Sequence, residues 1–242
     1  MNKDIKTKES VCQEKVDWDR IVHLLKLGII SAIMVLIGDM LLGWGVSDPS
    51  VTQLPSVLTR YLTVSDGRII ASAMLGLVGI PIECLCWFSI YRLIRPYSEK
   101  DAHAYRAGII GCLAFGGCGV HVPCCAAVYL AKQHFYIDDP STVSDEMIRL
   151  LAWFLIPATV IFSIFFFLAT MVQIKAFLVG HTPFPRWCCV FSLLFGFVWV
   201  VLMRIIGDHA ITNALSTGWI SIGNIWMMGG LLLMSNKVRN NE

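Results

Sequence analysis

Residues 21–45 read IVHLLKLGIISAIMVLIGDMLLGWG, and this stretch decides the class of protein. At ~1.5 Å of helical rise per residue, it is long enough to cross the ~30 Å hydrocarbon layer of a bilayer. The whole chain has 242 residues, of which 56% are hydrophobic and only 15% are charged, and its mean hydropathy is +0.68. These values exclude a water-soluble globular domain and predict a membrane protein.

Five further apolar runs follow the first, and each is bounded by polar turns. They lie at 69–91, 107–131, 149–174, 187–206 and 216–235. Each run is predicted to be a helix, because an open strand in lipid would leave its backbone groups without hydrogen bonds. The sequence therefore predicts an all-α fold, a polytopic bundle of six transmembrane helices over 21–235, with polar tails at 1–20 and 236–242.

The basic residues predict the orientation of this bundle. When the polar segments are assigned to alternate sides of the membrane, fourteen of the 19 Lys and Arg residues fall on the side that holds both tails. The other five are Arg60, Arg68, Lys132, Arg149 and Arg204. Because short cytoplasmic segments are enriched in Lys and Arg, both termini are expected in the cytoplasm. The first helix is expected to remain as an uncleaved anchor, since the charge pattern before it is unlike that of a secretory signal.

Cysteine placement and net charge bear on the kinds of site and partner to expect. Eight of the nine cysteines lie in or beside the apolar runs, so a disulfide framework is not expected. Close pairs occur at Cys84/Cys86, Cys124/Cys125 and Cys188/Cys189. Their spacing differs from the CxxC of a zinc site, so they are interpreted as packing residues, and no metal or other cofactor is predicted. The net charge of +2 does not suggest a nucleic-acid partner, and the expected partner is the lipid bilayer.

Several tryptophan residues lie at the edges of the predicted spans. They are Trp18, Trp44, Trp87, Trp187 and Trp219. Because Trp is enriched at the interface between membrane and water, these five are predicted to form an interfacial belt rather than a cofactor site.

Four polar side chains lie inside the predicted spans and are the candidate ligand-binding or proton-coupling residues. They are Asp39, Glu83, His121 and Asn224. On insertion scales, an Asp at the centre of a transmembrane helix costs about 2.5–3.5 kcal/mol, so such a residue needs a partner, a proton or water. By helical rise, Asp39, His121 and Asn224 lie roughly 9–15 Å below the outer surface, and Glu83 lies deepest. The matched depth predicts that the four side chains meet in a polar cavity that opens outward.

The loop after the fifth predicted span is expected to lie above this cavity. Its candidates for the cavity mouth are Arg204, Asp208 and His209. A purely structural role remains the alternative interpretation of the polar residues below it. In that case Asp39 pairs with His121 or Arg204, and Asn224 joins two helices through hydrogen bonds.

Three classes of function remain open. The first is binding or transport of a small molecule or lipid headgroup, because Glu83 and His121 each lie close to Gly and Pro, as proton-coupling residues of transporters often do. Six spans without a visible repeat are few for a transporter, so this class implies a homo-oligomer. The second is an intramembrane enzyme that modifies lipid, with or without a metal ion, for which the sequence assigns no catalytic residue. The third is an accessory or immunity-type membrane protein with no small-molecule site.

Several short motifs resemble those of a group of uncharacterised bacterial membrane proteins with six spans. The motifs are IGDMLLGW (37–44), GIP (79–81), IYRLIRP (90–96), the GxxxH of Gly117 to His121, PFPRW (183–187) and SIGN (221–224). That group carries the label of a domain of unknown function. The resemblance implies a protein of the bacterial cytoplasmic membrane and implies no activity, substrate or catalytic residue.

Overall fold

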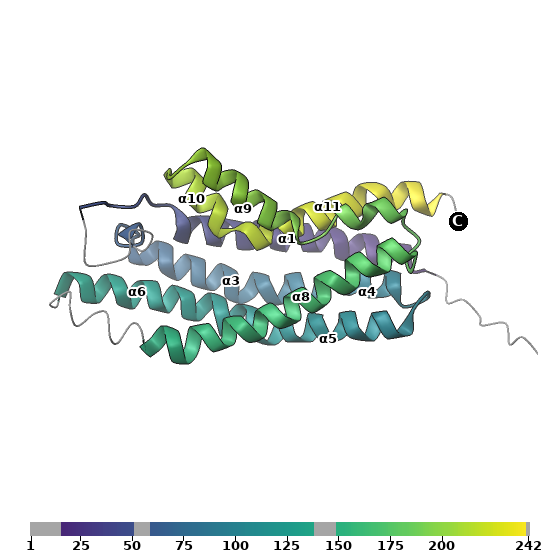
Figure 1. Cartoon of the computed structure of the whole chain (residues 1–242), viewed down its shortest axis with the longest axis horizontal. Helices are drawn as coiled ribbons and strands as arrows, with labels where there is room; N and C mark the ends of the chain where they lie inside the picture. Colours follow the sequence, from purple (N-terminus) through teal and green to yellow (C-terminus); the bar gives the residue numbers. More distant parts are fainter. Residues whose placement is uncertain (1–15, 51–58, 138–148, 241–242) are drawn as a thin grey trace, which may run out of the picture.

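The structure is a computed structural model that describes residues 16–50, 59–137 and 149–240. All of the elements in these ranges are helices (Figure 1), so the prediction of an all-α fold is confirmed. Most of the predicted N-terminal tail and the last two residues lie outside the described ranges.

The helices differ widely in length. In chain order they are α1 (Trp18–Gly43), α3 (Asp66–Cys86), α4 (Phe88–Ile94), α5 (Glu99–Phe115), η1 (Gly116–His121), α6 (Val122–Ile137), η2 (Leu151–Leu155), α8 (Ile156–Val179), η3 (Arg186–Val190), α9 (Phe195–Ile206), α10 (Ala210–Thr217) and α11 (Trp219–Arg239). Besides the fifth predicted run, which is described below, three runs that the sequence predicts as single spans contain a break. Trp87 separates α3 from α4, the π-helical turn η1 separates α5 from α6, and Gly218 separates α10 from α11.

Within the described ranges, four helical runs are long and apolar enough to cross a bilayer. They cover 18–43, 66–94, 99–133 and 151–179. A fifth crossing is counted if α10 and α11, which are bent by 64° relative to each other, form one span. The structure therefore contains counterparts of the first four predicted spans and a bent counterpart of the sixth.

The fifth predicted span, 187–206, is divided in the structure. The short 3-10 helix η3 is followed by an irregular segment and then by α9, whose 12 residues extend for only ~18 Å. The backbone groups exposed by this break have side-chain partners. Trp226 Nε1 donates to the Val190 carbonyl at 2.8 Å, and Gln173 Nε2 donates to the Phe191 carbonyl at 2.9 Å. An irregular backbone at this depth is tolerated because neighbouring helices satisfy its polar groups.

Small residues let the long helices pack closely. In α1, Gly28 lies against Met228 of α11, and in α3, Gly79 lies against Val35 of α1. In α5, Gly108 lies against the backbone of Ala169 in α8. Larger side chains at these positions would separate the helices, which explains why the small residues of the sequence follow the packed faces.

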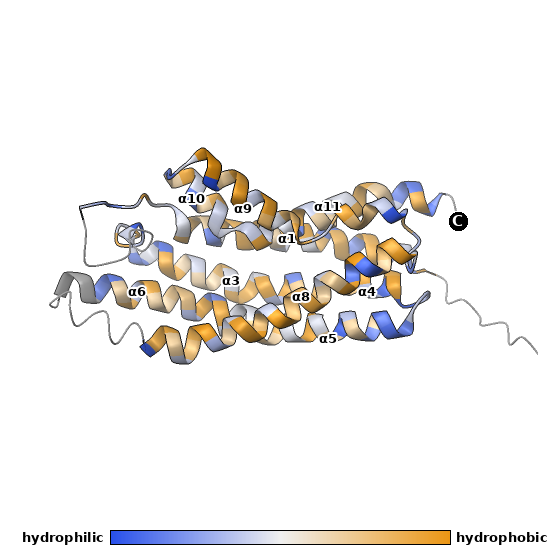
Figure 2. Cartoon of the chain, in the orientation of Figure 1, coloured by the Kyte–Doolittle hydropathy of each residue, from blue (hydrophilic) through white to orange (hydrophobic). Residues whose placement is uncertain are grey.

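The polar parts of the molecule gather at the two ends of the bundle. Figure 2 shows hydrophobic residues over the middle of the long helices and hydrophilic residues mainly toward their ends. The described N-terminal residues and the end of α11 lie at the same end (Figure 1), where Arg239 Nη1 pairs with Asp19 Oδ1 at 2.9 Å. Large apolar side chains remain exposed along the middle, including Ile164 of α8 at 60% and Leu233 of α11 at 82%. This distribution is typical of a surface that faces lipid.

Candidate functional site

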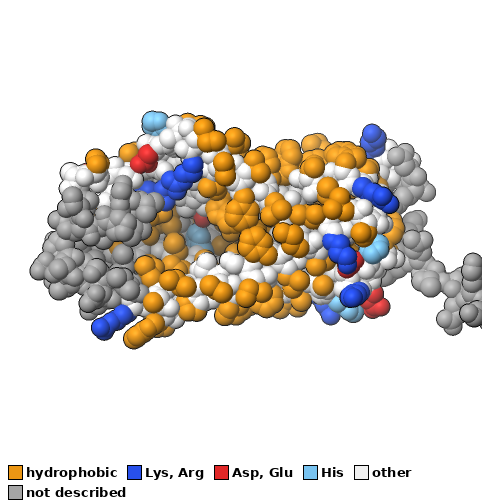
Figure 3. All heavy atoms as spheres, viewed as in Figure 1, with side chains coloured by type: hydrophobic (Ala, Val, Ile, Leu, Met, Phe, Trp, Pro, Cys, Tyr) orange, Lys and Arg blue, Asp and Glu red, His pale blue; other side chains and the backbone are white. Residues whose placement is uncertain are grey.

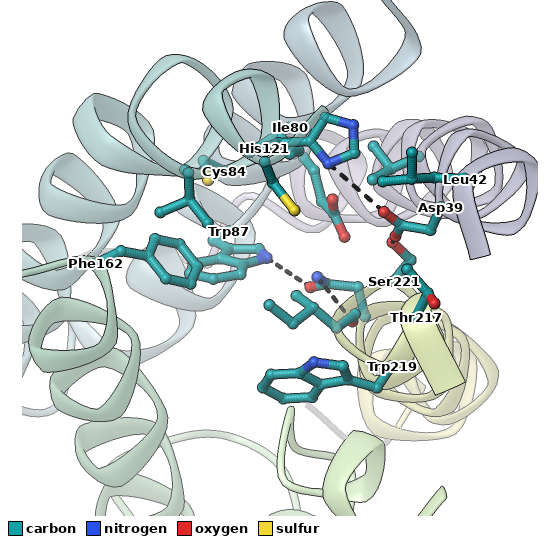
Figure 4. Close-up of a pocket in the computed structure, with 17 residues that line it drawn as sticks. Asp39, Leu42, Ile80, Cys84, Trp87, His121, Phe162, Thr217, Trp219 and Ser221 are labelled. Carbon is teal, nitrogen blue, oxygen red and sulfur yellow. Dashed lines mark hydrogen bonds and ion pairs between the residues drawn. The ribbon is translucent and has the colours of Figure 1, made fainter. Parts of the chain in front are cut away.

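A cavity of about 260 Å³ lies between α1, α3, η1, α8 and α11. Its polar lining comes from Asp39, Glu83, His121, Ser221 and Asn224, among others. Its apolar lining includes the aromatic rings of Trp87, Phe162 and Trp219. Figure 4 shows Trp87 and Phe162 on one side of this cavity and Asp39 on the other. The volume is close to the lower end of the ~300–1,000 Å³ range of small-molecule sites.

Each of the three breaks described above supplies a residue to the cavity. Trp87 is itself the break between α3 and α4, His121 is the last residue of η1, and Trp219 follows the break at Gly218. Pro123, two residues after His121, has no N–H and therefore cannot continue the helical hydrogen-bond ladder. π-helical turns such as η1 occur frequently at functional sites. Three irregular segments thus converge on this one cavity.

His121 links three helical segments through its two ring nitrogens. Its Nε2 lies 3.0 Å from the Ser72 carbonyl oxygen, and its Nδ1 lies 3.6 Å from Asp39 Oδ1. Because a carbonyl oxygen only accepts, Nε2 carries the ring proton and donates a hydrogen bond to the Ser72 carbonyl. The remaining nitrogen therefore faces the carboxyl group, and their contact is favourable when a proton resides on one of the two.

Gly76 in α3 makes room for the His121 ring. A methyl group at Gly76 would overlap the imidazole, so only glycine permits this position of the ring. The His121 and Asp39 side chains are 11% and 13% exposed, respectively. The pair is thus almost fully enclosed, and it is held in place by the close approach of α3.

A second set of hydrogen bonds fixes the α11 side of the cavity. Ser221 Oγ donates to Asp39 Oδ2 at 3.1 Å, which ties α11 to α1. Trp87 Nε1 donates to Asn224 Oδ1 at 2.7 Å, and Asn224 Nδ2 donates to the Ile220 carbonyl at 3.3 Å. The Asn224 side chain also lies close to the carboxyl group of Glu83. Asn224 is completely buried, so these contacts determine its orientation.

Glu83 is the deepest acidic residue and its hydrogen bonding is incomplete. The residue is 3% exposed, and its Oε1 atom has no hydrogen-bond partner within the described part of the chain. A buried polar atom without a partner costs about 1–3 kcal/mol. The cavity thus presents an acceptor that a proton, a water molecule or a ligand can satisfy.

All four polar residues that the sequence predicts to share a cavity line this one: Asp39, Glu83, His121 and Asn224. The three mouth candidates do not line it. Arg204 is exposed in the last turn of α9, and His209 precedes α10, where its backbone N–H bonds to Thr212 at 3.0 Å.

Asp208 instead belongs to a hydrogen-bonded cluster at the start of α10. Asn213 Nδ2 donates both to Asp208 and to the Gly45 carbonyl, the latter at 2.8 Å. Hydrogen bonds from Asn213 and Ser47 lower the pKa of the Asp208 carboxyl group. The cluster connects the segment after α1 to α10, so Asp208 has a structural role in this fold.

The prediction of an interfacial belt is wrong for Trp87 and does not fit Trp18, which is 7% exposed within the core. Trp87 is 2% exposed and lines the cavity, because its indole N–H bonds to Asn224 rather than to interfacial water. Trp219 also lines the cavity and packs against Phe166 with ring centroids 5.7 Å apart. Sequence reasoning also gave no site role to Ser221, although it lies three residues before Asn224 on the same face of α11.

Within the described ranges, no three His, Cys, Asp or Glu side chains are grouped so as to hold a metal ion. The cavity brings together two carboxyl groups and one imidazole, groups that can form hydrogen bonds and exchange protons, beside aromatic walls.

Comparisons with known proteins connect the chain to relatives without an assigned activity. No curated protein and no solved structure matches it significantly. A family model does match, over residues 1–238, and its description reads "Family of unknown function (DUF6796)". This match confirms the part of the sequence resemblance that concerned a family of unknown function, and the chain belongs to the DUF6796 family.

Proposed function

We propose that this protein is a multi-pass integral membrane protein that crosses the bacterial cytoplasmic membrane six times, with both termini in the cytoplasm. An even number of crossings is supported by the contact between Asp19 and Arg239, which come from opposite ends of the chain. The excess of Lys and Arg on the tail side supports the cytoplasmic assignment of that end. In this topology η3 and α9 together form the fifth crossing, and α10 and α11 form the sixth.

The central cavity, in this proposal, binds a small molecule or a lipid headgroup, and binding is coupled to a proton. The observation that carries the proposal is the buried Oε1 of Glu83, which lacks a hydrogen-bond partner among the described residues and lines the same cavity as the Asp39–His121 pair. Intramembrane ionisable residues are costly, and they commonly mark substrate pathways and proton relays. Interrupted helices beside such residues are a common feature of transporter binding sites.

We prefer binding or transport to an enzymatic role because of the side chains that line the cavity. The lining contains two carboxyl groups and the imidazole of His121. The two ring nitrogens face the Ser72 carbonyl and the Asp39 carboxyl group, so His121 is not placed to activate a hydroxyl group of the lining. No activated nucleophile is therefore apparent in the cavity. If the activity is transport, the small number of crossings implies a homo-oligomer.

The topology is tested with single cysteines at exposed positions in a Cys12→Ser background. Lys100→Cys and Arg239→Cys are expected to react with a membrane-impermeant maleimide only after the membrane is opened. Arg149→Cys is expected to react in intact cells. Reaction of Arg239→Cys but not of Lys100→Cys from outside would indicate an odd number of crossings, and reaction of both would indicate the opposite orientation; either result would overturn the proposed topology.

The binding site is tested with purified protein in nanodiscs and a panel of amines, carboxylic acids, alcohols, sugars and phospholipids. Trp87 and Trp219 line the cavity, so tryptophan fluorescence reports its occupancy. We expect at least one chemical class to change the fluorescence of the wild type and to have a weaker effect on Glu83→Gln. The matched control is Glu99→Gln, an exposed residue at the start of α5, which is expected to behave like wild type. If no class binds in a Glu83-dependent way, the proposed site is rejected.

A further inference from the structure

We propose that the ligand of this cavity is an organic cation, a protonated amine attached to an apolar or aromatic body, and that it enters from the side of the bundle in exchange for a proton. The inference rests on the proposed function of the cavity and specifies the chemical class of its ligand.

The charge of the lining favours a cation. Its titratable residues are Asp39 from α1, Glu83 and Cys84 from α3, His121 from η1 and Cys124 from α6. The lining residues from α8, α10 and α11 are not titratable, and the described lining contains neither Lys nor Arg. Asp39 and Glu83 are close enough to repel each other when both are ionised. The two carboxyl groups therefore require protons or a cation, whereas an anionic ligand would add to the repulsion.

The hydrogen-bonding groups of the lining call for a donor. Asp39 already accepts from Ser221, and Asn224 already accepts from Trp87. The Oε1 atom of Glu83, which the protein leaves without a partner in the described ranges, is an acceptor when the carboxyl group is ionised. An ammonium group supplies up to three donors and a positive charge, so it satisfies both requirements at once.

The walls suit the apolar part of such a ligand. Trp87, Phe162 and Trp219 present aromatic rings to the cavity, and the faces of aromatic rings attract cations. Aliphatic side chains such as Ile80 and Ile220 complete the apolar lining. A phosphate or a sugar would bring polar groups that this surface cannot satisfy.

Access is from the long side of the bundle. Figure 3 shows a recess on that side, with acidic and histidine side-chain atoms at its floor, hydrophobic side chains on either side and Lys or Arg atoms above it. On one side of the cavity the seam between α8 and its neighbours is closed by ring contacts, Phe166 with Trp219 at 5.7 Å and Phe167 with Phe197 at 6.0 Å. Phe162, one turn earlier in α8, lines the cavity. An amine dissolved in the membrane interface can reach the carboxyl groups by this route without crossing the polar ends.

The exchange reaction balances in charge and protons. A carboxylic acid in the cavity and an ammonium ion from solution give a carboxylate paired with the bound ammonium ion, and one proton is released to solution. The bond that breaks is the O–H of the acid, and no bond of the amine changes.

The test compares three probes with similar bodies: phenethylamine, phenethyl alcohol and 3-phenylpropionate. They are titrated against the full chain in nanodiscs near pH 7, where the amine is protonated. We expect the amine to bind about ten- to a hundredfold more tightly than the alcohol, as is typical of a charge-assisted hydrogen bond. The 3-phenylpropionate anion is expected to bind most weakly. In weak buffer, roughly one proton should be released per bound amine.

Variants show whether the carboxyl groups are responsible. Glu83→Gln should abolish the preference for amine over alcohol, Glu83→Asp should retain part of it, and Glu99→Gln should leave it unchanged. Retention of folding is checked by the elution volume and the melting temperature of each variant. Equal binding of amine and alcohol, preference for the anion, or an unchanged preference in Glu83→Gln would overturn the cation assignment.

The same experiment separates this inference from the proposed function. If a neutral or anionic compound of the wider panel binds in a Glu83-dependent way and the amine does not, only the cation assignment fails. If nothing binds, both fail. Nanodiscs with and without phosphatidylethanolamine distinguish the source of the ammonium group, because a lipid headgroup in the cavity would weaken the apparent affinity for phenethylamine.

Discussion

His121 Nδ1 lies 3.6 Å from Asp39 Oδ1, and this contact joins the π-helical turn η1 to the first long helix. The other ring nitrogen is bonded to the Ser72 carbonyl of α3, so the ring cannot turn without losing a hydrogen bond. The imidazole is therefore held beside the Asp39 carboxyl group at the meeting point of three helical segments.

Gly76→Ala tests whether the position of this ring matters. The added methyl group would overlap the His121 imidazole and displace it from Asp39. We expect a loss of about 1–3 kcal/mol of stability, which is typical of overpacking, together with weaker ligand binding. Gly67→Ala is the matched control in the same helix, because a methyl group there meets no atom within 4 Å. Equal effects of the two substitutions on binding would show that the ring position is unimportant.

The bond between Trp87 and Asn224 is tested by a double-mutant cycle. Trp87→Phe removes the donor and leaves the buried Asn224 Oδ1 without it, which is expected to cost about 1–3 kcal/mol beyond the packing loss. Adding Asn224→Leu to Trp87→Phe should recover part of this loss, because the amide oxygen that lost its donor is removed. Stability is measured by reversible unfolding in mixed micelles, and the exposed Trp153→Phe is the control. Additive effects of the two substitutions would indicate that the bond contributes little.

The sequence was sufficient to predict four polar residues of the cavity but not its aromatic walls or its shape. Helical spacing and the small residues beside Asp39, Glu83, His121 and Asn224 indicated their inward faces, because a face depends only on positions along one helix. The belt interpretation of Trp87 was wrong because its partner, Asn224, is 137 residues away in the sequence. That pairing depends on how α3 and α11 pack, which a local pattern does not contain.

The divided fifth span was unpredictable for the same reason. Residues 187–206 form a continuous apolar run, and the segment at 191–194 contains no Pro or Gly to indicate a break. The break is compensated by side chains from other helices, Trp226 of α11 and Gln173 of α8. The position of Asp208 likewise follows from α10 folding back toward the segment after α1, where Asn213 reaches the Gly45 carbonyl.

The cluster around Asp208 predicts a pH dependence of local stability. Its pKa is lower in the folded protein than the unfolded value of ~3.9, so ionisation stabilises the fold. This contribution is fully present above pH ~3.9 and is lost as the pH falls through the folded pKa. We expect Asp208→Asn to speed amide exchange in α10 at neutral pH, with a difference from wild type that shrinks in acid. The effect should be small, because Asp208 is exposed. A difference that grows in acid would contradict the assignment.

The close contact between α9 and the start of α11 indicates that a glycine is required at position 196. A side chain at Gly196 would collide with the Trp219 backbone carbonyl, and backbone atoms cannot yield as a flexible side chain can. Gly196→Ala is therefore expected to destabilise the protein by about 1–3 kcal/mol and to shift Trp219, which lines the cavity. Gly229→Ala in α11, where a methyl group meets no neighbouring atom within 4 Å, should leave the melting temperature nearly unchanged. Tryptophan fluorescence and thermal unfolding measure both effects. If Gly196→Ala changes stability but not ligand binding, the break between α10 and α11 serves packing alone. A loss of binding that exceeds the loss of stability would show that this break shapes the cavity.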